Sequence, residues 1–154
     1  MKFSLVIPTL NEEETLEEVL KSVIGITDDI FIIDGKSTDN TKNIAQKFSV
    51  PFYEDDGYGK GSAIKKAIFI AKNPISVFMD ADGSHDPKDI ERLVEPIKNH
   101  GFDLVIGSRM LGGSDELFGS FSEFIRLLGS MIISLTINYR FNVRFTDYQN
   151  GFRA

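Results

Sequence analysis

The sequence has 154 residues, of which 42% are apolar and 26% are charged, a composition typical of one soluble domain with a buried core. It contains no cysteine, so disulfides, zinc–thiolate sites and thiol nucleophiles are excluded. The formal net charge of -6 argues against nucleic acid as a general partner.

Charge is distributed unevenly along the chain. Residues 118–154 carry four arginines and two acids, a balance of +2 (four minus two), which leaves -8 for the rest. The same segment is the most apolar part of the sequence. A basic, apolar segment attached to an acidic body favours contact with a membrane surface or an anionic partner. The apolar run at the N-terminus is short and is followed by acids, so we expect no signal peptide.

In chain order, apolar runs typical of strands alternate with segments of helical periodicity. Strands are predicted at residues 3–7, 29–34, 51–53, 75–80 and 102–108. Helices are predicted between them, at residues 11–24, 37–48, 63–73 and 87–101. Because the strands are continuously apolar, the pattern predicts an α/β fold with a mainly parallel sheet covered by helices on both faces.

The carboxyl ends of the strands are the expected ligand site, because open sheets of this kind bind ligands there. Four strand ends would meet at this edge, namely residues 8–12, 34–37, 80–84 and 107–109. We therefore expect residues that are distant in sequence to line a single crevice.

Two carboxylates stand one residue apart at the end of the fourth predicted strand, in the sequence MDADGSHD. Because side chains at positions i and i+2 of a strand face the same way, Asp80 and Asp82 can point at one ion. Oxygen ligands with an open coordination sphere suit Mg²⁺ or Mn²⁺, above all an ion shared with substrate phosphates. The alternative is that these acids form a turn and cap the helix that begins at Pro87.

Other candidate features also have a functional and a purely structural interpretation. The loop at residues 57–61, with Lys60, can offer backbone N–H groups and a cation to phosphate, or its glycines can serve a turn with positive φ. Arg109 can pair bidentately with phosphate or form a surface salt bridge. The two histidines, His85 and His100, make no metal pair in the sequence, and neither is assigned to catalysis.

Six segments, in order, resemble the family 2 glycosyltransferases of the GT-A fold, and within them the dolichyl-phosphate mannose synthase-like branch. They are LVIPTLNEE, IIDGKSTDNT, GKGSAI, FMDADGSHDP, DLVIGSR and TDYQNGFRA, and they cover nearly the whole chain. The resemblance implies a Rossmann-like GT-A sheet, with residues 1–154 forming a single catalytic domain. It also implies an inverting enzyme that moves a sugar from a nucleotide-sugar donor to a polyprenyl or dolichyl phosphate lipid.

The resemblance further implies which residues hold the donor. Asp34 lies where the family contacts the base. Many relatives have Asp-Asp-Gly-Ser there, whereas this chain has Asp-Gly-Lys-Ser at residues 34–37. Pro8, Leu10 and Glu12 match the segment that holds the base and ribose, and Lys60, Asp80 and Ala81 are the remaining nucleotide-binding candidates.

Metal and phosphate contacts follow from the same resemblance. Asp80 and Asp82 match the family's metal-binding acid pair, and Ser84 falls where some members have a metal-binding Gln. Arg109 matches an arginine that contacts the phosphates. A Mg²⁺ or Mn²⁺ ion together with Arg109 would stabilise the negative charge that develops on the departing nucleoside diphosphate.

On the acceptor side, Asp147 matches the residue proposed as catalytic base, and Arg126 roughly matches an arginine implicated in binding the lipid phosphate. An acceptor phosphate, with a second pKa of about 6, is already largely ionised, so Asp147 acts either as a base or as an orienting group. Taken alone, an Asp in such a loop is usually a cap or turn former.

Residues 118–141 are interpreted as one or two amphipathic helices lying on a membrane, because the longest uncharged stretch, at residues 127–139, falls short of the ~20 residues needed to span it. The alternative is a helix packed in the core or at the interface of a homo-oligomer. Residues 111–119 are expected to form a loop that closes over substrate. We therefore expect a cytoplasmic protein, held peripherally at the cytoplasmic face of the membrane.

Alternatives to this function stay open. The acceptor can instead be a glycan or another membrane lipid, and GDP-mannose, UDP-glucose and other donors are all compatible with the motifs. A sugar-1-phosphate nucleotidylyltransferase is a weaker candidate, because PTLNEEE lacks the Gly-rich, Arg-containing first loop of that class. Relatives usually continue beyond the last motif, so a truncated chain or a non-catalytic nucleotide-binding module is also considered.

Overall fold

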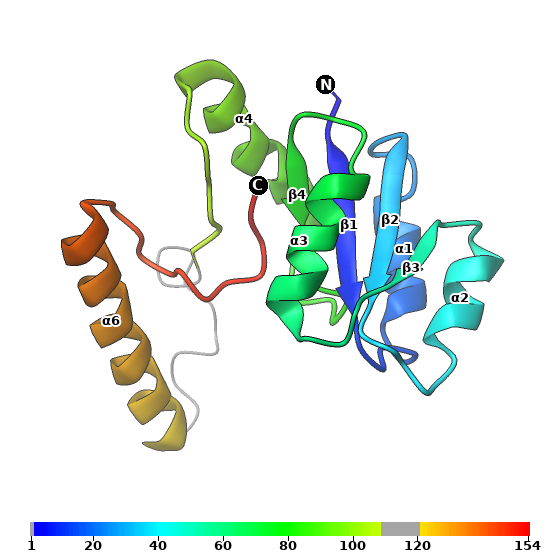
Figure 1. The fold of residues 1–154 in the computed structure, drawn as a ribbon, viewed down its shortest axis with the longest axis horizontal. Helices are drawn as coiled ribbons and strands as arrows, with labels where there is room; N and C mark the ends of the chain where they lie inside the picture. The colour runs from blue at the N-terminus through cyan, green and yellow to red at the C-terminus, as the bar shows by residue number, and fades with distance from the viewer. Residues whose placement is uncertain (1, 109–120) are drawn as a thin grey trace. The chain divides into compact units, whose positions relative to one another are not determined.

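The computed structural model describes residues 2–108 and 121–154, apart from the side chains of residues 121–128. The chain divides into two compact units. The first contains Met1–Val105 together with Phe152–Ala154, and the second contains Ile106–Gly151. A sheet with its helices makes up the first unit, and one long helix dominates the described part of the second (Figure 1).

Within the described residues of the first unit, four parallel strands form a sheet in the order β3-β2-β1-β4. Their bounds are β1 (Ser4–Thr9), β2 (Asp29–Asp34), β3 (Phe52–Glu54) and β4 (Ser76–Phe78). In the centre, Ser4 of β1 lies opposite Asp29 of β2 on one side and Ser76 of β4 on the other. The predicted α/β fold with a mainly parallel sheet is confirmed.

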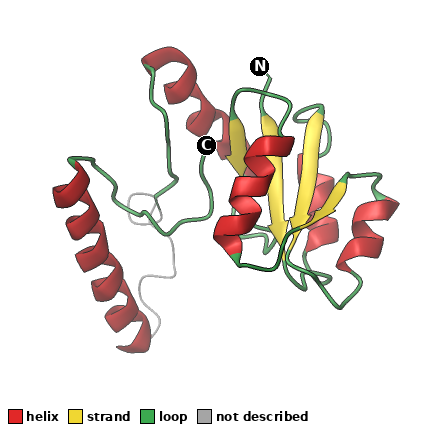
Figure 2. Ribbon diagram, in the orientation of Figure 1, coloured by secondary structure: helices red, strands yellow, loops and turns green. Residues whose placement is uncertain are grey.

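Helices cover both faces of this sheet (Figure 2). They are α1 (Leu16–Val23), α2 (Thr41–Lys47), α3 (Lys60–Ile70) and α4 (Ile90–His100), the last preceded by the 3₁₀ turn η1 (Pro87–Asp89). Helix α1 buries residues at positions i, i+3, i+4 and i+7, which is the stripe expected of a helix that packs on a sheet: Leu16, Val19, Leu20 and Val23.

Alternation along the strands divides the core into two layers, since successive side chains of a strand face opposite sides of the sheet. Leu5, Ile7 and Ile32 belong to the cluster that includes the apolar residues of α1 and α4. The intervening strand residues, Val6, Phe31 and Ile33, pack with Ala63 and Ala67 of α3.

Helix α1 is shorter than the predicted helix at residues 11–24, since Asn11 has φ of 57°, which lies outside the right-handed helical region. The N–H groups of residues 11–13 donate to the side chains of Ser37, Thr41 and Asp39, at 2.8, 2.9 and 3.1 Å. These groups therefore tie the loop after β1 to the loop after β2. Both loops reach the carboxyl edge of the sheet.

Helix α3 begins at Lys60, three residues before the predicted start at residue 63. Gly59 precedes it with φ of 89°, a conformation that glycine adopts readily. The carbonyl of Gly59 accepts hydrogen bonds from Ser62 and Ala63, so the glycine loop passes directly into the helix. Lys60 consequently lies in the first turn of α3.

The prediction of a strand at residues 102–108 is wrong for the structure. Val105 exchanges two backbone hydrogen bonds with Ala154, both 2.9 Å, and Arg153 exchanges two with Phe78, at 2.7 and 3.2 Å. The bridge between Phe78 and Arg153 is antiparallel. A strand requires consecutive pairs along a ladder, so these separate bonds extend the sheet locally without forming another strand.

The described part of the second unit contains α6 (Phe121–Phe141), one helix of 21 residues where the sequence predicted one or two. A turn follows it, in which the Asn138 side chain donates to the carbonyl of Phe145 and accepts from its N–H, both at 2.8 Å. Within the part of the chain that the structure describes, no helix combines the length and hydrophobicity required to cross a membrane.

Candidate functional site

A cavity of about 480 Å³ lies at the carboxyl ends of the parallel strands. This is the edge at which the sheet topology predicts ligand binding, and the volume is in the range of small-molecule sites. Every strand of the sheet contributes to it, directly or through the loop that follows. The lining residues are Pro8, Thr9, Leu10, Glu12, Ile33, Gly35, Asp55, Gly57, Gly59, Lys60, Ala63, Asp80, Ala81 and Asp82.

The cavity brings together most of the predicted donor-site residues of the first unit. Those that line it are Pro8, Leu10, Glu12, Lys60, Asp80, Ala81 and Asp82. Two other predicted residues, Asp34 and Ser84, do not belong to the lining. The binding roles of all these residues stay predictions, whereas their positions at one sheet edge are now defined.

Asp80 is compensated by two basic side chains. Lys60 Nζ lies 2.8 Å from Oδ1, and His85 Nε2 lies 3.5 Å from Oδ2. The hydrogen bond with His85 lowers the pKa of the Asp80 carboxyl, burial opposes this effect, and Lys60 lowers the pKa further, to about 2. Asp80 is therefore an anion throughout the neutral range, and its repulsion from Asp82 is offset.

His85 is held in place by an aromatic neighbour from the end of the chain. Its ring stacks on that of Phe152, with centroids 4.8 Å apart and 12° between the planes. The His85 side chain is 10% exposed. Sequence analysis assigned no role to His85, although its position five residues after Asp80, on a tight turn, was a usable signal.

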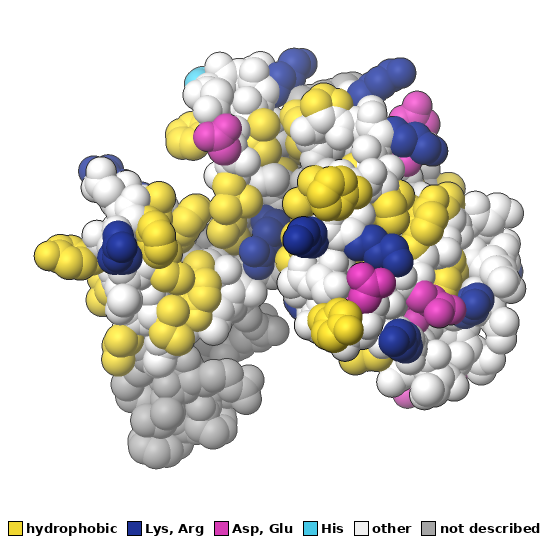
Figure 3. All heavy atoms as spheres, in the orientation of Figure 1, with side chains coloured by type: hydrophobic (Ala, Val, Ile, Leu, Met, Phe, Trp, Pro, Cys, Tyr) yellow, Lys and Arg dark blue, Asp and Glu magenta, His cyan; other side chains and the backbone are white. Residues whose placement is uncertain are grey.

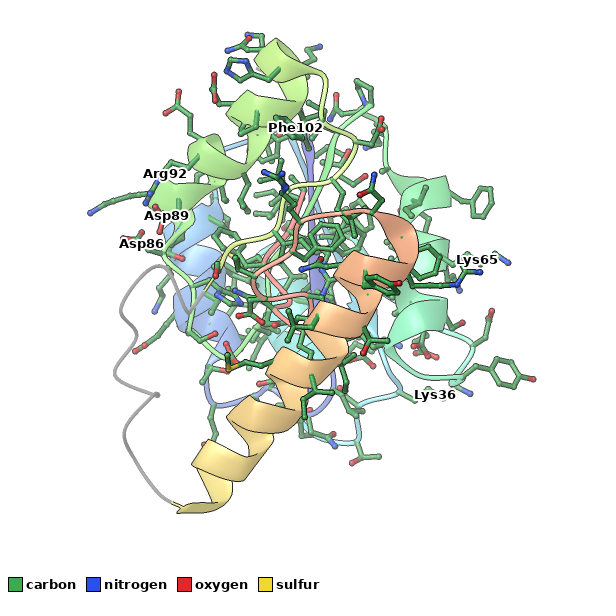
Figure 4. The ribbon with its side chains drawn as sticks, turned by 90° about the vertical axis from the view of Figure 1, so that its left-hand side faces the viewer. Lys36, Lys65, Asp86, Asp89, Arg92 and Phe102 are labelled. Atoms are coloured by element: carbon green, nitrogen blue, oxygen red, sulfur yellow. The ribbon has the colours of Figure 1, made fainter. Side chains whose placement is uncertain are left out.

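The alternative interpretation of the acidic cluster, in which its acids form a turn and cap the following helix, is also confirmed in part. Asp82 Oδ1 accepts a hydrogen bond from the Ser84 N–H at 2.9 Å, which forms a turn. Asp86 Oδ1 accepts from the Lys88 N–H at 2.9 Å and caps η1. Asp86 lies close to Asp89 and Arg92 at the start of α4 (Figure 4). The same segment therefore forms the turn and presents two carboxylates to the cavity.

Glu12 adds a third carboxylate to the cavity wall. Burial raises its pKa, a hydrogen bond from Thr15 opposes this, and the negative charges of Asp82 and Asp80 raise it again. The three acids therefore affect one another electrostatically. Among the described residues there is no group of three or more His, Asp or Glu side chains that could hold a metal ion by themselves. The acid pair suits an ion that takes further ligands from substrate phosphates or water.

Asp34 has a clear structural role at the end of β2. It is 2% exposed, and its carboxylate accepts hydrogen bonds from Thr9 Oγ1 at 2.7 Å, from the Ser37 N–H at 2.7 Å and from Ser37 Oγ at 2.5 Å. Asp34 thus joins β1 to the turn after β2. Its next neighbour, Gly35, lines the cavity without a side chain.

Asp55 is a cavity residue that sequence analysis missed. It follows β3, is 6% exposed, and accepts a hydrogen bond at Oδ1 from the Gly57 N–H at 2.6 Å. The rule that ligands bind at strand ends would have found it. The third predicted strand ends at Tyr53, two residues before Asp55.

The remaining candidates are Arg109, assigned to the donor phosphates, and Arg126 and Asp147, assigned to the acceptor. Arg109 and residues 111–119 lie outside the described residues, and so does the side chain of Arg126. Asp147 belongs to the second unit and is buried, at 4% exposed. In that unit, the Asn150 side chain donates to the Gly107 carbonyl at 2.8 Å, which joins the motifs DLVIGSR and TDYQNGFRA. The roles of these candidates stay predictions.

Comparison with known proteins identifies the family. Residues 4–153 match the family model described as Glycosyl transferase family 2. The chain belongs to this family. It is 35% identical to an uncharacterized protein of Methanocaldococcus jannaschii over 97% of this chain and 63% of that protein. It is 37% identical to the dolichol-phosphate mannosyltransferase of Pyrococcus furiosus over 73% of this chain and 34% of the relative. It therefore spans less than two thirds of either relative.

Solved structures agree on the fold. The glucosyl-3-phosphoglycerate synthase of Mycobacterium tuberculosis, crystallised with Mn²⁺ and UDP-glucose, superposes with a TM-score of 0.68 and 24% identity. The superposition covers 99% of this chain and 55% of the mycobacterial chain. The sheet and its helices therefore have the GT-A fold, in a chain of the family 2 glycosyltransferases.

Proposed function

We propose that this chain is the catalytic domain, or part of it, of a metal-dependent inverting glycosyltransferase. It would transfer a sugar from a nucleotide-sugar to a polyprenyl or dolichyl phosphate. The observation that carries the proposal is the pair Asp80 and Asp82, which meets Lys60 in a cavity at the carboxyl edge of the sheet. The name of the Pyrococcus relative supports the lipid acceptor. The Mn²⁺ and UDP-glucose bound to the mycobacterial fold relative support the metal and the donor.

In this proposal, different residues of the cavity bind different parts of the donor. Pro8 and Leu10 provide apolar surface for the base, and Glu12 can accept hydrogen bonds from ribose hydroxyls. The diphosphate would lie near Lys60, where the ammonium and the first N–H groups of α3 attract anions.

Asp80 and Asp82, with Ser84 as a further candidate, would hold a Mg²⁺ or Mn²⁺ ion. Asp80 is suited to this because its low pKa of about 2 keeps it ionised. The bound ion would supply charge stabilisation for the departing nucleoside diphosphate. Arg109 would add a second positive charge to the same phosphates. In this proposal Asp147 orients or deprotonates the acceptor, and Arg126 binds the lipid phosphate.

Helix α6 is proposed to rest on the cytoplasmic face of the membrane and to bring the acceptor phosphate to the domain. Ile132, Leu135 and Tyr139 recur at positions i, i+3 and i+7 and are 64%, 66% and 93% exposed. Apolar side chains gather along the described part of α6 (Figure 3). Arg140 and Arg144, both exposed, add positive charge that anionic lipids attract.

The donor-site proposal can be tested by calorimetry of nucleoside diphosphates, with Mn²⁺ present and absent. Asp82→Asn is expected to weaken the Mn²⁺-dependent binding about tenfold or more, because a charge-assisted contact is worth roughly 1.5–3 kcal/mol. The variant should still fold, since the Asn oxygen can accept the Ser84 N–H. Asp89→Asn, in an exposed ion pair with Arg92, is the matched control. Full Mn²⁺ dependence in Asp82→Asn would contradict the metal assignment.

The acceptor proposal needs a separate transfer assay. A labelled nucleotide-sugar should give a labelled lipid with a short-chain polyprenyl phosphate, and no labelled product with the unphosphorylated alcohol. Equal transfer to a free glycan, or equal transfer to the unphosphorylated alcohol, would contradict the proposed acceptor. Neither result would affect the donor-site proposal.

A further inference from the structure

We propose that Asp55 selects the base of the nucleotide donor by accepting a hydrogen bond from a ring N–H of that base. The inference rests on the proposed function and deepens it, since it names the class of nucleotide that the cavity takes. Uracil and guanine carry such a ring N–H, at N3 and N1, whereas the corresponding nitrogens of cytosine and adenine are acceptors. The chain is therefore expected to use uridine or guanosine donors.

The end of β2 places no carboxylate on the wall of the cavity. Gly35 lines the cavity but has no side chain. Asp34 is 2% exposed and lies outside the lining, and its carboxylate accepts three hydrogen bonds from Thr9 and Ser37. A base in the cavity would need to displace this network to reach Asp34. Another acceptor must therefore serve the base.

Asp55 has the position and the spare oxygen that Asp34 lacks. It lines the cavity from the end of β3, and its N–H donates to the Asp34 carbonyl at 2.8 Å, which anchors it beside β2. Its Oδ1 accepts the Gly57 N–H at 2.6 Å. Among the described residues, no hydrogen bond or ion pair engages Oδ2. A carboxylate oxygen that is largely removed from water and unpaired is costly, and a ligand N–H would satisfy it.

The surroundings of Asp55 suit a flat aromatic base. Pro8, Leu10, Ile33 and Ala63 give the cavity apolar walls. Gly57 holds the carboxylate in one orientation, because its N–H bond to Oδ1 closes a tight turn with φ of 78°. The acceptor is thus preorganised before the base arrives.

Discrimination follows from the acceptor-only nature of a carboxylate. A ring N–H of uracil or guanine forms a charge-assisted hydrogen bond with Oδ2. The lone pair of cytosine N3 or adenine N1 would face the same oxygen, so two acceptors would be buried against each other. Specificity of this kind comes from penalising the wrong ligand as well as from binding the right one.

The test is calorimetric titration of the 154-residue chain with UDP, GDP, CDP and ADP, each in the presence of Mn²⁺. The wild-type chain is expected to bind UDP or GDP about tenfold or more tightly than either CDP or ADP. Asp55→Asn keeps the size of the side chain and an oxygen for Gly57, but it presents an amide to the base. We expect this variant to reduce the preference for UDP or GDP by about 10- to 100-fold, partly through a gain in CDP affinity.

Asp56→Asn is the matched control, because Asp56 is the neighbouring acid and its side chain is 66% exposed. It should leave all four affinities unchanged. Equal wild-type binding of all four nucleotides, or an unchanged preference in Asp55→Asn, would overturn the role of Asp55. In that case Mn²⁺-dependent binding would still support the proposed function. If no nucleoside diphosphate binds at all, both proposals fail. If the variant does not fold, equal wild-type binding of the four nucleotides would still overturn the role of Asp55.

Discussion

Lys60 and His85 contact different oxygens of Asp80, so both oxygens already have a basic neighbour before any metal ion binds. The Lys60 ammonium lies 2.8 Å from Oδ1, so a metal ion bound to Asp80 would share or displace that contact. Lys60 therefore has opposite effects on the two proposed ligands. It competes with a free cation for the carboxylate, and it attracts the phosphates of a nucleotide.

Replacing Lys60 by Met should separate these two effects. We expect Mn²⁺ alone to bind several-fold more tightly, because a competing charge is removed, and the Mn²⁺–nucleotide complex to bind about tenfold more weakly. Calorimetry with Mn²⁺, and then with nucleotide at saturating Mn²⁺, measures both. Lys65→Met is the matched control, since Lys65 points outward from the same helix (Figure 4). Two affinities that move in the same direction would contradict the competition.

At the scale of the elements, the end of the sheet opposite the cavity is held by Asp29 of β2. Its carboxylate accepts hydrogen bonds from Ser4 Oγ at 2.6 Å and from the Lys72 N–H at 3.0 Å. Burial would raise the pKa of Asp29, but the bonds from Ser4 and Lys72 outweigh it and lower the pKa. Asp29 therefore connects the starts of β1 and β2 with the end of α3.

The lowered pKa predicts how the stability contribution of Asp29 depends on pH. Because the folded state prefers the ionised form, the contribution is fully present above the unfolded pKa of about 3.9 and is lost as the pH falls through the lower folded value. Asp29→Asn should lower the free energy of unfolding by about 1–3 kcal/mol at pH 7, and by less near pH 2 to 3. Urea denaturation at both pH values measures this difference.

Asp28→Asn, a change to the exposed neighbouring acid, should have little effect at either pH. A difference between wild type and Asp29→Asn that stays constant from pH 7 to pH 2 would show that the charge of Asp29 contributes nothing.

Helix α6 carries an exposed apolar stripe that the proposed membrane contact explains. Leu135→Glu places a charge in the middle of this stripe. We expect about tenfold weaker binding to vesicles that contain anionic lipid, since a large apolar contact worth roughly 1.5–3 kcal/mol is lost. Co-sedimentation with vesicles measures it. Gln149→Glu adds the same charge at an exposed polar position and should bind nearly as well as wild type. Equal losses in both variants would point to net charge instead of the stripe.

At the scale of the whole molecule, the chain returns to its first unit at the very end. Arg153 and Ala154 pair with Phe78 and Val105, and Phe152 is buried against His85. Residues separated by about half the chain length therefore complete the sheet beside β4 (Figure 1). The last motif, TDYQNGFRA, ends in this pairing and supports the ring that contacts Asp80.

Phe152→Ala is expected to destabilise the protein by about 3–5 kcal/mol, because it removes a buried aromatic ring and leaves a cavity. Urea denaturation at pH 7 measures the change. Phe141→Ala is the matched control: Phe141 is 67% exposed, so its loss should cost less than about 1 kcal/mol. Similar losses in the two variants would show that the packing of Phe152 against the first unit is unimportant for stability.

Much of the fold was predictable because its signals are local. The strand at Asp29–Asp34 has its predicted bounds, and α1 follows from apolar spacing that any helix of this kind shows. The predicted strand at residues 102–108 was wrong because pairing depends on a partner segment, which here is the distant Ala154. The helix start at residue 11 was wrong because Asn11 adopts φ of 57°, in a loop whose backbone bonds to Ser37, Asp39 and Thr41.

The sequence by itself determined the α/β class, the edge of the sheet that forms the cavity, and the presence of Asp80 and Asp82 at that edge. Periodicity, strand composition and the spacing of two acids are properties of residues that are close in sequence, so they can be read without knowing the tertiary contacts. Only the tertiary structure decided that Asp34 is enclosed by Thr9 and Ser37 while Asp55 lines the cavity. It alone brought Lys60 to Asp80, 20 residues away. Such contacts arise from the packing of strands and loops against one another, because an acid is a ligand or a cap according to the donors that surround it.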